Sequence, residues 1–381
     1  MTTPTGTIGL SDVNVELGYS SSATISLNDA AVRALAGIAS GTISLNDLRG
    51  KSAISYVAVA HATAPRTSVY PWSSSGFGTK YANPSLALTV TAYAVSAYQA
   101  SRLIYAQGSG AFAAYDWSAS GFGSRYADPG SGFPLPGSVY GIAWAPNGAG
   151  MITAHVGSPY TSGWRFGSTG FGTKYSAPSN GPTNTAYGVA FHPTTSELSV
   201  SHNTTPYVST YPFTSGAGYG TRYSSPASGV SGRGEGTAFG VSGSSSALSV
   251  STATTPWVNV YAWNSGFGTK YSNPSTTPTG IGNNVRFARD GAYIGVAHNT
   301  SPFISVYPWS MSTGFGSKFS NPSTLPTALA NSIDFAGSQV AVAHDSSPYV
   351  SAYPYSSSGF GTKFSNPATL PTGNGEGIAF F

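Results

Sequence analysis

The sequence predicts an all-β protein: a seven-bladed β-propeller closed by its C-terminal strand and preceded by a small α+β N-terminal unit. Three observations support this fold class. A six-residue motif, Gly-aromatic-Gly-Thr/Ser-Lys/Arg-aromatic, occurs seven times, its copies start 45 to 49 residues apart, and the segments between them show the alternation of short strands. A repeat of this length made of strands is typical of propeller blades, and seven blades close into a disc. The copies start at Gly76, Gly121, Gly170, Gly218, Gly266, Gly314 and Gly359.

Composition is compatible with one large repeat domain. The 381 residues are 40% hydrophobic and 13% aromatic, which supplies a core, and only 7% charged. Seven of the 16 basic residues belong to the repeated motif, so the net charge of +4 is spread around the repeats, which argues against a nucleic-acid-binding protein. Without cysteine there is no disulfide or thiolate metal site. No apolar run of 18 residues and no signal-peptide pattern occurs, so we expect no membrane insertion.

Each blade should hold four strands, as the fourth repeat illustrates. Strand-like patterns cover 187–191, 198–202 and 207–213, and the motif within 218–226 supplies the fourth strand. Because the fourth strand of a propeller blade is outermost, the Lys or Arg of each motif should lie on the rim. This basic rim is a candidate surface for binding an anionic ligand or a protein neighbour. The alternative is that the charged ends only contact water and bind nothing. Its members are Lys80, Arg125, Lys174, Arg222, Lys270, Lys318 and Lys363.

Two other positions recur in the blades. The second strand ends in His61, His155, His202, His298 or His344 in five of them. Equivalent residues of separate blades converge only on the central axis, so these histidines should form no metal site and should instead bond turn backbones. The third strand carries two aromatic positions that face the same way and should form core between blades or, alternatively, a binding platform. The tryptophans among them, a second set of candidate ligand-binding residues, are Trp72, Trp117, Trp263 and Trp309.

The two ends of the repeat region predict how the ring closes. Only two strands, 56–60 and 67–72, precede the first motif, whereas the chain finishes on 377–381, which has a first-strand sequence and no blade after it. We therefore expect this last segment to complete the first blade, which removes the open sheet edges.

Residues 1–52 lie outside the repeat and have a small repeat of their own, Ile-Gly/Ser-Leu-Ser/Asn-Asp, which starts at Ile8, Ile25 and Ile43. Each copy resembles a short extended stretch that leads into a helix, with Ser11, Asn28 and Asn46 as expected N-caps. The clearest helix is 29–36. A unit of about 50 residues has little core of its own, so we expect it to pack on another surface and divide the chain into 1–52 and 53–381.

The run from Ile25 to Gly37 and the run from Gly41 to Ser52 resemble N-terminal segments of tailed-bacteriophage virion proteins, namely minor tail and tail fibre-like proteins. The blades look like the WD40-like repeats of phage-encoded propellers, although they have neither the Gly-His start nor the Trp-Asp end of WD40 repeats. The resemblance implies a viral tail protein, made in the host cytoplasm and located in the virion. It also implies contacts of 1–52 with other phage tail proteins and several symmetry-related copies per virion.

The sequence offers little catalytic chemistry. Beyond the N-terminal unit we expect the acidic residues to occupy unlike positions in different blades, so no pair is expected at the separation a glycosidase needs. They are Asp116, Asp128, Glu197, Glu235, Asp290, Asp334, Asp345 and Glu376. We therefore expect no catalytic residue, no metal and no cofactor. The leading hypothesis is a structural protein for host attachment, which binds a host cell-surface glycan or scaffolds other tail proteins. The alternatives are a free-standing β-propeller lectin and, third, a propeller glycoside hydrolase.

Overall fold

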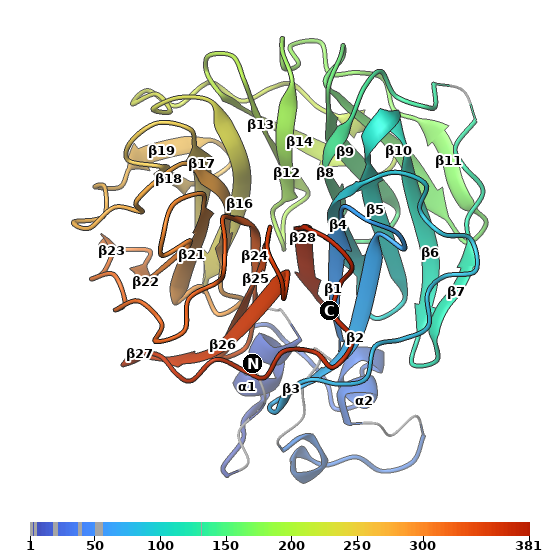
Figure 1. Cartoon of the computed structure of the whole chain (residues 1–381), viewed down its shortest axis with the longest axis vertical. Helices are drawn as coiled ribbons and strands as arrows, with labels where there is room; N and C mark the ends of the chain where they lie inside the picture. Colours follow the sequence, from blue (N-terminus) through green and yellow to red (C-terminus); the bar gives the residue numbers. More distant parts are fainter. Residues whose placement is uncertain (1–2, 4–5, 18–21, 37–39, 50–55, 131) are drawn as a thin grey trace.

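A computed structural model describes residues 3, 6–17, 22–36, 40–49, 56–130 and 132–381. Seven four-stranded antiparallel sheets stand around a central axis (Figure 1), which confirms the seven-bladed β-propeller. No helix in the described part of the chain has the length and apolar character that crossing a membrane requires.

The strands of each blade run outward from the axis in chain order, except that the last strand of the chain is the innermost strand of blade 1. Blades 1 to 3 contain β28 (Gly375–Phe380), β1 (Tyr56–His61), β2 (Thr67–Ser73), β3 (Gly76–Phe77); β4 (Ala92–Tyr98), β5 (Arg102–Gln107), β6 (Phe112–Ser118), β7 (Gly121–Arg125); and β8 (Val139–Trp144), β9 (Gly150–His155), β10 (Thr161–Gly167), β11 (Gly170–Lys174). A single 3-10 turn, η2 (Gly108–Gly110), joins β5 to β6.

The remaining four blades repeat the same order. They contain β12 (Ala186–Phe191), β13 (Glu197–His202), β14 (Val208–Thr214), β15 (Gly218–Tyr219); β16 (Gly234–Ser242), β17 (Ser245–Thr252), β18 (Val258–Trp263), β19 (Phe267–Lys270); β20 (Gly282–Phe287), β21 (Tyr293–His298), β22 (Ile304–Ser310), β23 (Gly314–Phe315); and β24 (Ala330–Ala336), β25 (Gln339–His344), β26 (Val350–Ser356), β27 (Gly359–Phe360).

The core lies between blades rather than at the centre of the disc. Strands such as β9 and β13 are buried along their whole length, because each of their faces packs against a neighbouring blade. One cluster joins Val57 and Trp72 of blade 1 to Ala341 and Val350 of blade 7, and another joins Val69 of blade 1 to residues of blade 2. The fold is therefore held together by successive inter-blade layers.

Blade 1 closes as the sequence predicts. β28 pairs with β1 in antiparallel register, with Val57 opposite Phe380 and Val59 opposite Ile378. Phe381, the next residue, is 5% exposed and packs its ring against Tyr56 and Trp117.

The outer strands are shorter than expected in four blades, and a proline explains which four. Where the third strand carries Pro71, Pro212, Pro308 or Pro354, the fourth strand is two residues long; where Asp116, Arg165 or Ala262 takes that place, it is four or five. The carbonyl of Pro71 accepts the N–H of Gly78 at 2.8 Å. Because the nitrogen and the carbonyl of one strand residue face the same side, the Pro71 nitrogen also faces the outer strand, where it has no proton to donate.

The N-terminal unit holds two short helices and one 3-10 turn around a small core of its own. These elements are α1 (Leu10–Glu16), α2 (Ala30–Ala36) and η1 (Leu45–Leu48), and the buried side chains include Ile8, Val13, Val32, Leu35 and Leu48. Its extended stretches form no strand within the described residues. The expected boundary between 52 and 53 lies outside the described residues.

The expected N-caps Ser11 and Asn46 are instead the second residues of α1 and η1, and Asn28 lies in a turn just before α2. Each turn starts at the Gly or Ser that precedes the leucine, and the aspartate three residues later accepts its backbone N–H: Gly9 to Asp12, Ser26 to Asp29 and Ser44 to Asp47, each at 2.8 Å. The aspartate reaches back as the third residue of a capping box does. Ser11, Asn28 and Asn46 therefore lie inside these turns.

Candidate functional site

The basic rim exists, but most of its cations are bonded within the chain. Lys318 donates to the Asn321 amide oxygen at 2.7 Å, Arg125 pairs with Asp128 at 2.6 Å, and Arg222 donates to the Ser225 hydroxyl at 2.8 Å. Lys80 and Lys363 bond Asn83 and Asn366 in the same way. Lys174 lies 5.1 Å from the centre of the Trp164 ring, and Lys270 makes no such bond with any of the described residues. Partial burial lowers the pKa of each of the five lysines. The Lys or Arg of the motif thus ties the outer strand to the loop that follows it.

The four candidate tryptophans belong to the core. Trp72, Trp117, Trp263 and Trp309 are only 4–6% exposed and make edge contacts with aromatic rings of their own and neighbouring blades. A platform for stacking a ligand needs an exposed ring face, and these rings present none. Of the two interpretations of the third-strand aromatics, the inter-blade core matches this arrangement.

The other aromatic position of the third strand is buried too, and its hydroxyl has a specific partner. In six blades a tyrosine hydroxyl donates to a backbone carbonyl of the segment that leads into the blade, as Tyr307 does to Thr276 at 2.9 Å. Blade 3 has Trp164 instead. These bonds hold each connecting segment against its blade.

The five recurring histidines are buried, and each bonds a serine side chain in addition to the backbone of the turn that follows it. Nε2 lies 3.0–3.1 Å from the hydroxyl of the serine seven residues later, as in His344 and Ser351. In His155 the backbone partner is the Val156 carbonyl, 3.0 Å from Nδ1. Burial lowers the pKa of each to about 4. Among the described residues no three His, Asp or Glu side chains gather closely enough to hold a metal ion.

A ring of side chains that the sequence analysis did not single out surrounds the axis. It consists of the second residue of each innermost strand, and all seven members are partly exposed. In order from blade 1 to blade 7 they are Glu376, Tyr93, Tyr140, Tyr187, Glu235, Asn283 and Asn331. The expectation that the acidic residues occupy unlike positions is therefore wrong for Glu235 and Glu376, which hold the same position in blades 5 and 1.

The three tyrosines form a continuous row across blades 2 to 4. The rings of Tyr93 and Tyr140 lie 5.1 Å apart at 56°, and those of Tyr140 and Tyr187 lie 5.4 Å apart at 26°. The strands behind them approach very closely: a Cβ on Gly188 would lie 2.9 Å from the Gly236 Cα. Gly188 and Gly236 are the third residues of their innermost strands. Small residues at this position let the innermost strands meet and leave room in front of the tyrosine row.

These residues line a cavity of about 220 Å³ at one end of the axial channel. Its wall in blades 2 to 4 is aromatic, and its wall in blades 5 to 7 is polar, with Asn283, Asn284 and Asn331. Asn283 donates to the Ala330 carbonyl at 2.8 Å, whereas the Asn284 amide oxygen is buried and has no hydrogen-bond partner. Deeper in, Arg286 donates to the Thr237 carbonyl at 3.3 Å. The cavity therefore offers one flat apolar side and one side rich in hydrogen-bonding groups.

The two carboxylates at the ends of the tyrosine row have different surroundings. Glu235 accepts a hydrogen bond from Arg233 Nε at 2.6 Å. Glu376 faces another carboxylate, Asp345, which Asn331 holds in place by a 2.7 Å bond. Burial, and then the charge of Asp345, raise the pKa of Glu376 to about 7.

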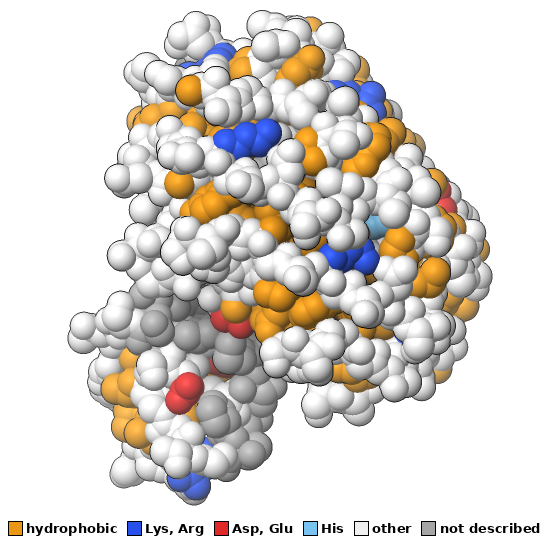
Figure 2. Space-filling model, turned by 90° about the vertical axis from the view of Figure 1, so that its left-hand side faces the viewer, with side chains coloured by type: hydrophobic (Ala, Val, Ile, Leu, Met, Phe, Trp, Pro, Cys, Tyr) orange, Lys and Arg blue, Asp and Glu red, His pale blue; other side chains and the backbone are white. Residues whose placement is uncertain are grey.

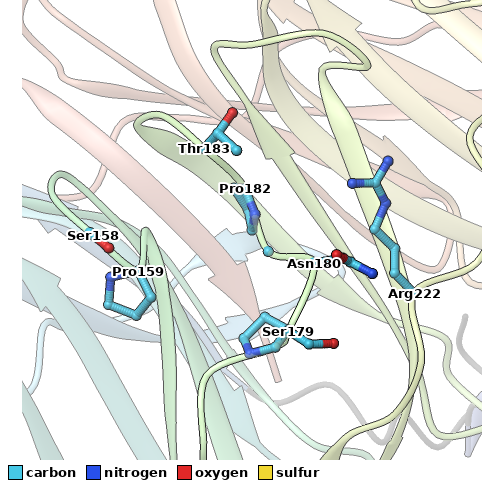
Figure 3. A pocket seen from close by; sticks show the side chains of 9 residues that line it. Ser158, Pro159, Ser179, Asn180, Pro182, Thr183 and Arg222 are labelled. Carbon is cyan, nitrogen blue, oxygen red and sulfur yellow. The ribbon is translucent and has the colours of Figure 1, made fainter.

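A second, larger hollow of about 620 Å³ opens between blades 3 and 4 (Figure 3). It lies between the β9–β10 turn, with Ser158 and Pro159, and the connecting segment 178–183, with Arg222 on the far side. The turn is on the same side of the disc as the ring, since His155 at the end of β9 pairs with Val139 at the start of β8. It has no aromatic side chain in its lining and Arg222 is already bonded to Ser225, so the axial cavity is the better candidate site.

Comparison with known proteins identifies the fold alone. No family model and no curated protein matches the chain. Among solved structures, a protein of unknown function from Desulfotomaculum acetoxidans is 13% identical with a TM-score of 0.61, over 85% of this chain and 98% of its own. Two proteins provisionally named 6-phosphogluconolactonases, from Bacteroides fragilis and Bacteroides uniformis, are 11% and 12% identical with TM-scores of 0.66, over 86–87% of this chain and 98–100% of theirs.

Proposed function

We propose that this protein is a non-enzymatic structural protein of a bacteriophage tail, and that its propeller binds a sugar residue of a host-surface glycan in the axial cavity. The observation that carries the proposal is the row Tyr93, Tyr140 and Tyr187 opposite a polar wall. A pyranose has an apolar face that stacks on aromatic rings and an edge of hydroxyls that needs donors and acceptors, and aromatic surfaces with a few placed polar groups are what small-ligand sites offer.

The size of the cavity supports a single sugar residue. Sites for drug-sized ligands have roughly 300–1,000 Å³, and this one has about 220 Å³. The amides of Asn283 and Asn331 in the lining can bond sugar hydroxyls, because an amide both donates and accepts.

The tail location is a separate part of the proposal. Its support is the resemblance of 25–52 to tail-protein segments and the small core that the N-terminal unit has of its own. In Figure 2 this unit forms a lobe beside the disc. In this arrangement 1–52 attaches to other tail proteins and the propeller is displayed. A chain lacking 1–52 should keep its fold and fail to join particles, as mass spectrometry of purified particles would reveal. Normal incorporation of the truncated chain would refute the attachment role.

The sugar site has its own test. Titration calorimetry of the full chain with monosaccharides should detect binding that Tyr140→Ala weakens about tenfold, the upper range for one aromatic contact. Tyr160→Ala is the matched control, since Tyr160 lies in the same blade outside the cavity lining. Equal binding by both variants and the parent would refute the site. A free-standing lectin would bind sugar equally well but would be absent from particles.

An enzyme is the competing function. The raised pKa of Glu376 suits a general acid or base at neutral pH, and two of the similar structures carry a lactonase name. The lining carries two carboxylates, Glu235 and Glu376, against one guanidinium, Arg286, which favours a neutral or cationic ligand over an anionic one. Turnover of a lactone or glycoside that Glu376→Gln abolishes would refute the non-enzymatic function.

A further inference from the structure

One end of the tyrosine row already binds a cation that the chain itself supplies. The Arg233 guanidinium carbon lies 5.2 Å from the centre of the Tyr187 ring, and the same guanidinium is paired with Glu235. An aromatic face beside a carboxylate is a favourable place for a cation, because the ring quadrupole and the negative charge attract it together.

The other end of the row has the same two components and no cation. Tyr93 holds the position equivalent to Tyr187, and the charge of Glu376 acts on its hydroxyl. Within the described residues neither Glu376 nor Asp345 pairs with a Lys or Arg. Two neighbouring carboxylates beside an aromatic face are therefore left without a positive partner, at the edge of a cavity that a ligand can enter.

We propose that this end of the cavity binds the positively charged nitrogen of the ligand, so that the preferred ligand is a sugar with a free amine. The nitrogen lies over Tyr93 and beside Glu376, where the nearby charge of Asp345 adds to the negative potential, while the sugar ring stacks along Tyr140. The proposal rests on the proposed sugar site and deepens it, because it names the class of sugar. A neutral or N-acylated sugar lacks the charge and gains only the stacking and hydroxyl contacts.

Asp345 does not line the cavity but is tied to Asn331, which does. It follows the last residue of β25, His344, and accepts from Asn331, whose amide also donates to the Gly375 carbonyl at 3.0 Å. Asn331 thereby couples Asp345 to the strand that carries Glu376. Asp345 is thereby held where its charge acts on Glu376 before a ligand arrives, which reduces the cost of ordering it.

The test uses the full chain and calorimetric titration with glucosamine, glucose, N-acetylglucosamine and tetramethylammonium. Glucosamine should bind about tenfold more tightly than glucose, the usual value of one charge-assisted contact with an aromatic face. Glu376→Gln and, independently, Asp345→Asn should remove that preference. Asp128→Asn, which changes a carboxylate on the rim, is the matched control and should leave it intact. Thermal unfolding confirms that each variant is folded.

The outcomes separate this inference from the proposed function. If all three sugars bind equally, or if Glu376→Gln and Asp345→Asn retain the glucosamine preference, the amine site is refuted and the sugar site stands. If no sugar binds but tetramethylammonium binds in a Glu376-dependent manner, the sugar site is refuted and the cation site stands. If none of the four probes binds, both are refuted.

Discussion

Tyr56 and Phe381 exchange two backbone hydrogen bonds: the N–H of Tyr56 donates to the Phe381 carbonyl at 2.9 Å, and the N–H of Phe381 donates to the Tyr56 carbonyl at 3.0 Å. Two side chains from other blades also hold this strand. Asp334 accepts the N–H of Phe380 at 2.8 Å, and Arg289 donates to its carbonyl at 3.2 Å. The ring is therefore closed by hydrogen bonds to three blades, and its last residue is part of the core.

The first prediction concerns this closure. Phe381→Ala should lower the free energy of unfolding by about 3–5 kcal/mol, as removal of a buried phenylalanine does, because Phe381 packs against Tyr56 and Trp117. Deletion of 377–381 should destabilise the protein further, since it also removes most of β28. Denaturant unfolding measures both, and Leu86→Ala, at a residue 59% exposed, is the control. An unchanged unfolding midpoint in the deletion variant would refute closure by this strand.

The second prediction concerns the prolines that shorten the outer strands. Pro308→Ala restores an N–H that faces β23, so β23 should lengthen and its amides should exchange more slowly with deuterium. Ala262→Pro is the converse change and should shorten β19, with faster exchange over 267–270. Exchange measured by mass spectrometry on the two peptides decides the matter. If neither substitution alters exchange, another feature sets the strand length.

The repeat made the fold predictable, whereas the site lies where the repeat breaks down. Positions that serve packing carry similar residues in nearly every blade, such as the serine-bonded histidines, and their period revealed seven blades and the closing strand. The ring around the axis instead carries Tyr, Glu or Asn at one position. Glu235 and Glu376 are each followed by a glycine, as Tyr140 and Tyr187 are. An alignment of the innermost strands on that glycine would have brought the two glutamates to one position. The partner of Glu376 could not be found in this way, because Asp345 comes from a turn of another blade.

The third prediction concerns acid stability. The pKa of His344 is lowered from 6.5 to about 4 by burial, so the unfolded chain binds more protons than the folded one between these values. Stability should therefore be complete above about pH 6.5 and fall as the pH drops toward 4. His344→Gln, which copies Gln107 of blade 2, should reduce this dependence by up to roughly 3 kcal/mol. Unfolding free energies at pH 7 and 4.5 test it, and an unchanged difference between the two would refute the assignment.

The last prediction links Glu376 to its ligand. Its pKa of about 7 leaves the carboxyl about half protonated at pH 7. The groups that act on it are Asp345 and, on the neighbouring blade, Tyr93. A cation binds the ionised carboxylate more favourably, so binding must lower that pKa and release protons. Tetramethylammonium carries no proton of its own, which makes it the clean probe.

Titrations at pH 7 in two buffers with different ionisation enthalpies should therefore reveal the release of up to about half a proton per site. The release should vanish at pH 9, where Glu376 is already ionised, and in Glu376→Gln at any pH. Asp128→Asn should behave like the parent, because Asp128 lies on the rim beside Arg125. Binding without proton release at pH 7, or release that persists in Glu376→Gln, would place the cation elsewhere than beside this carboxylate.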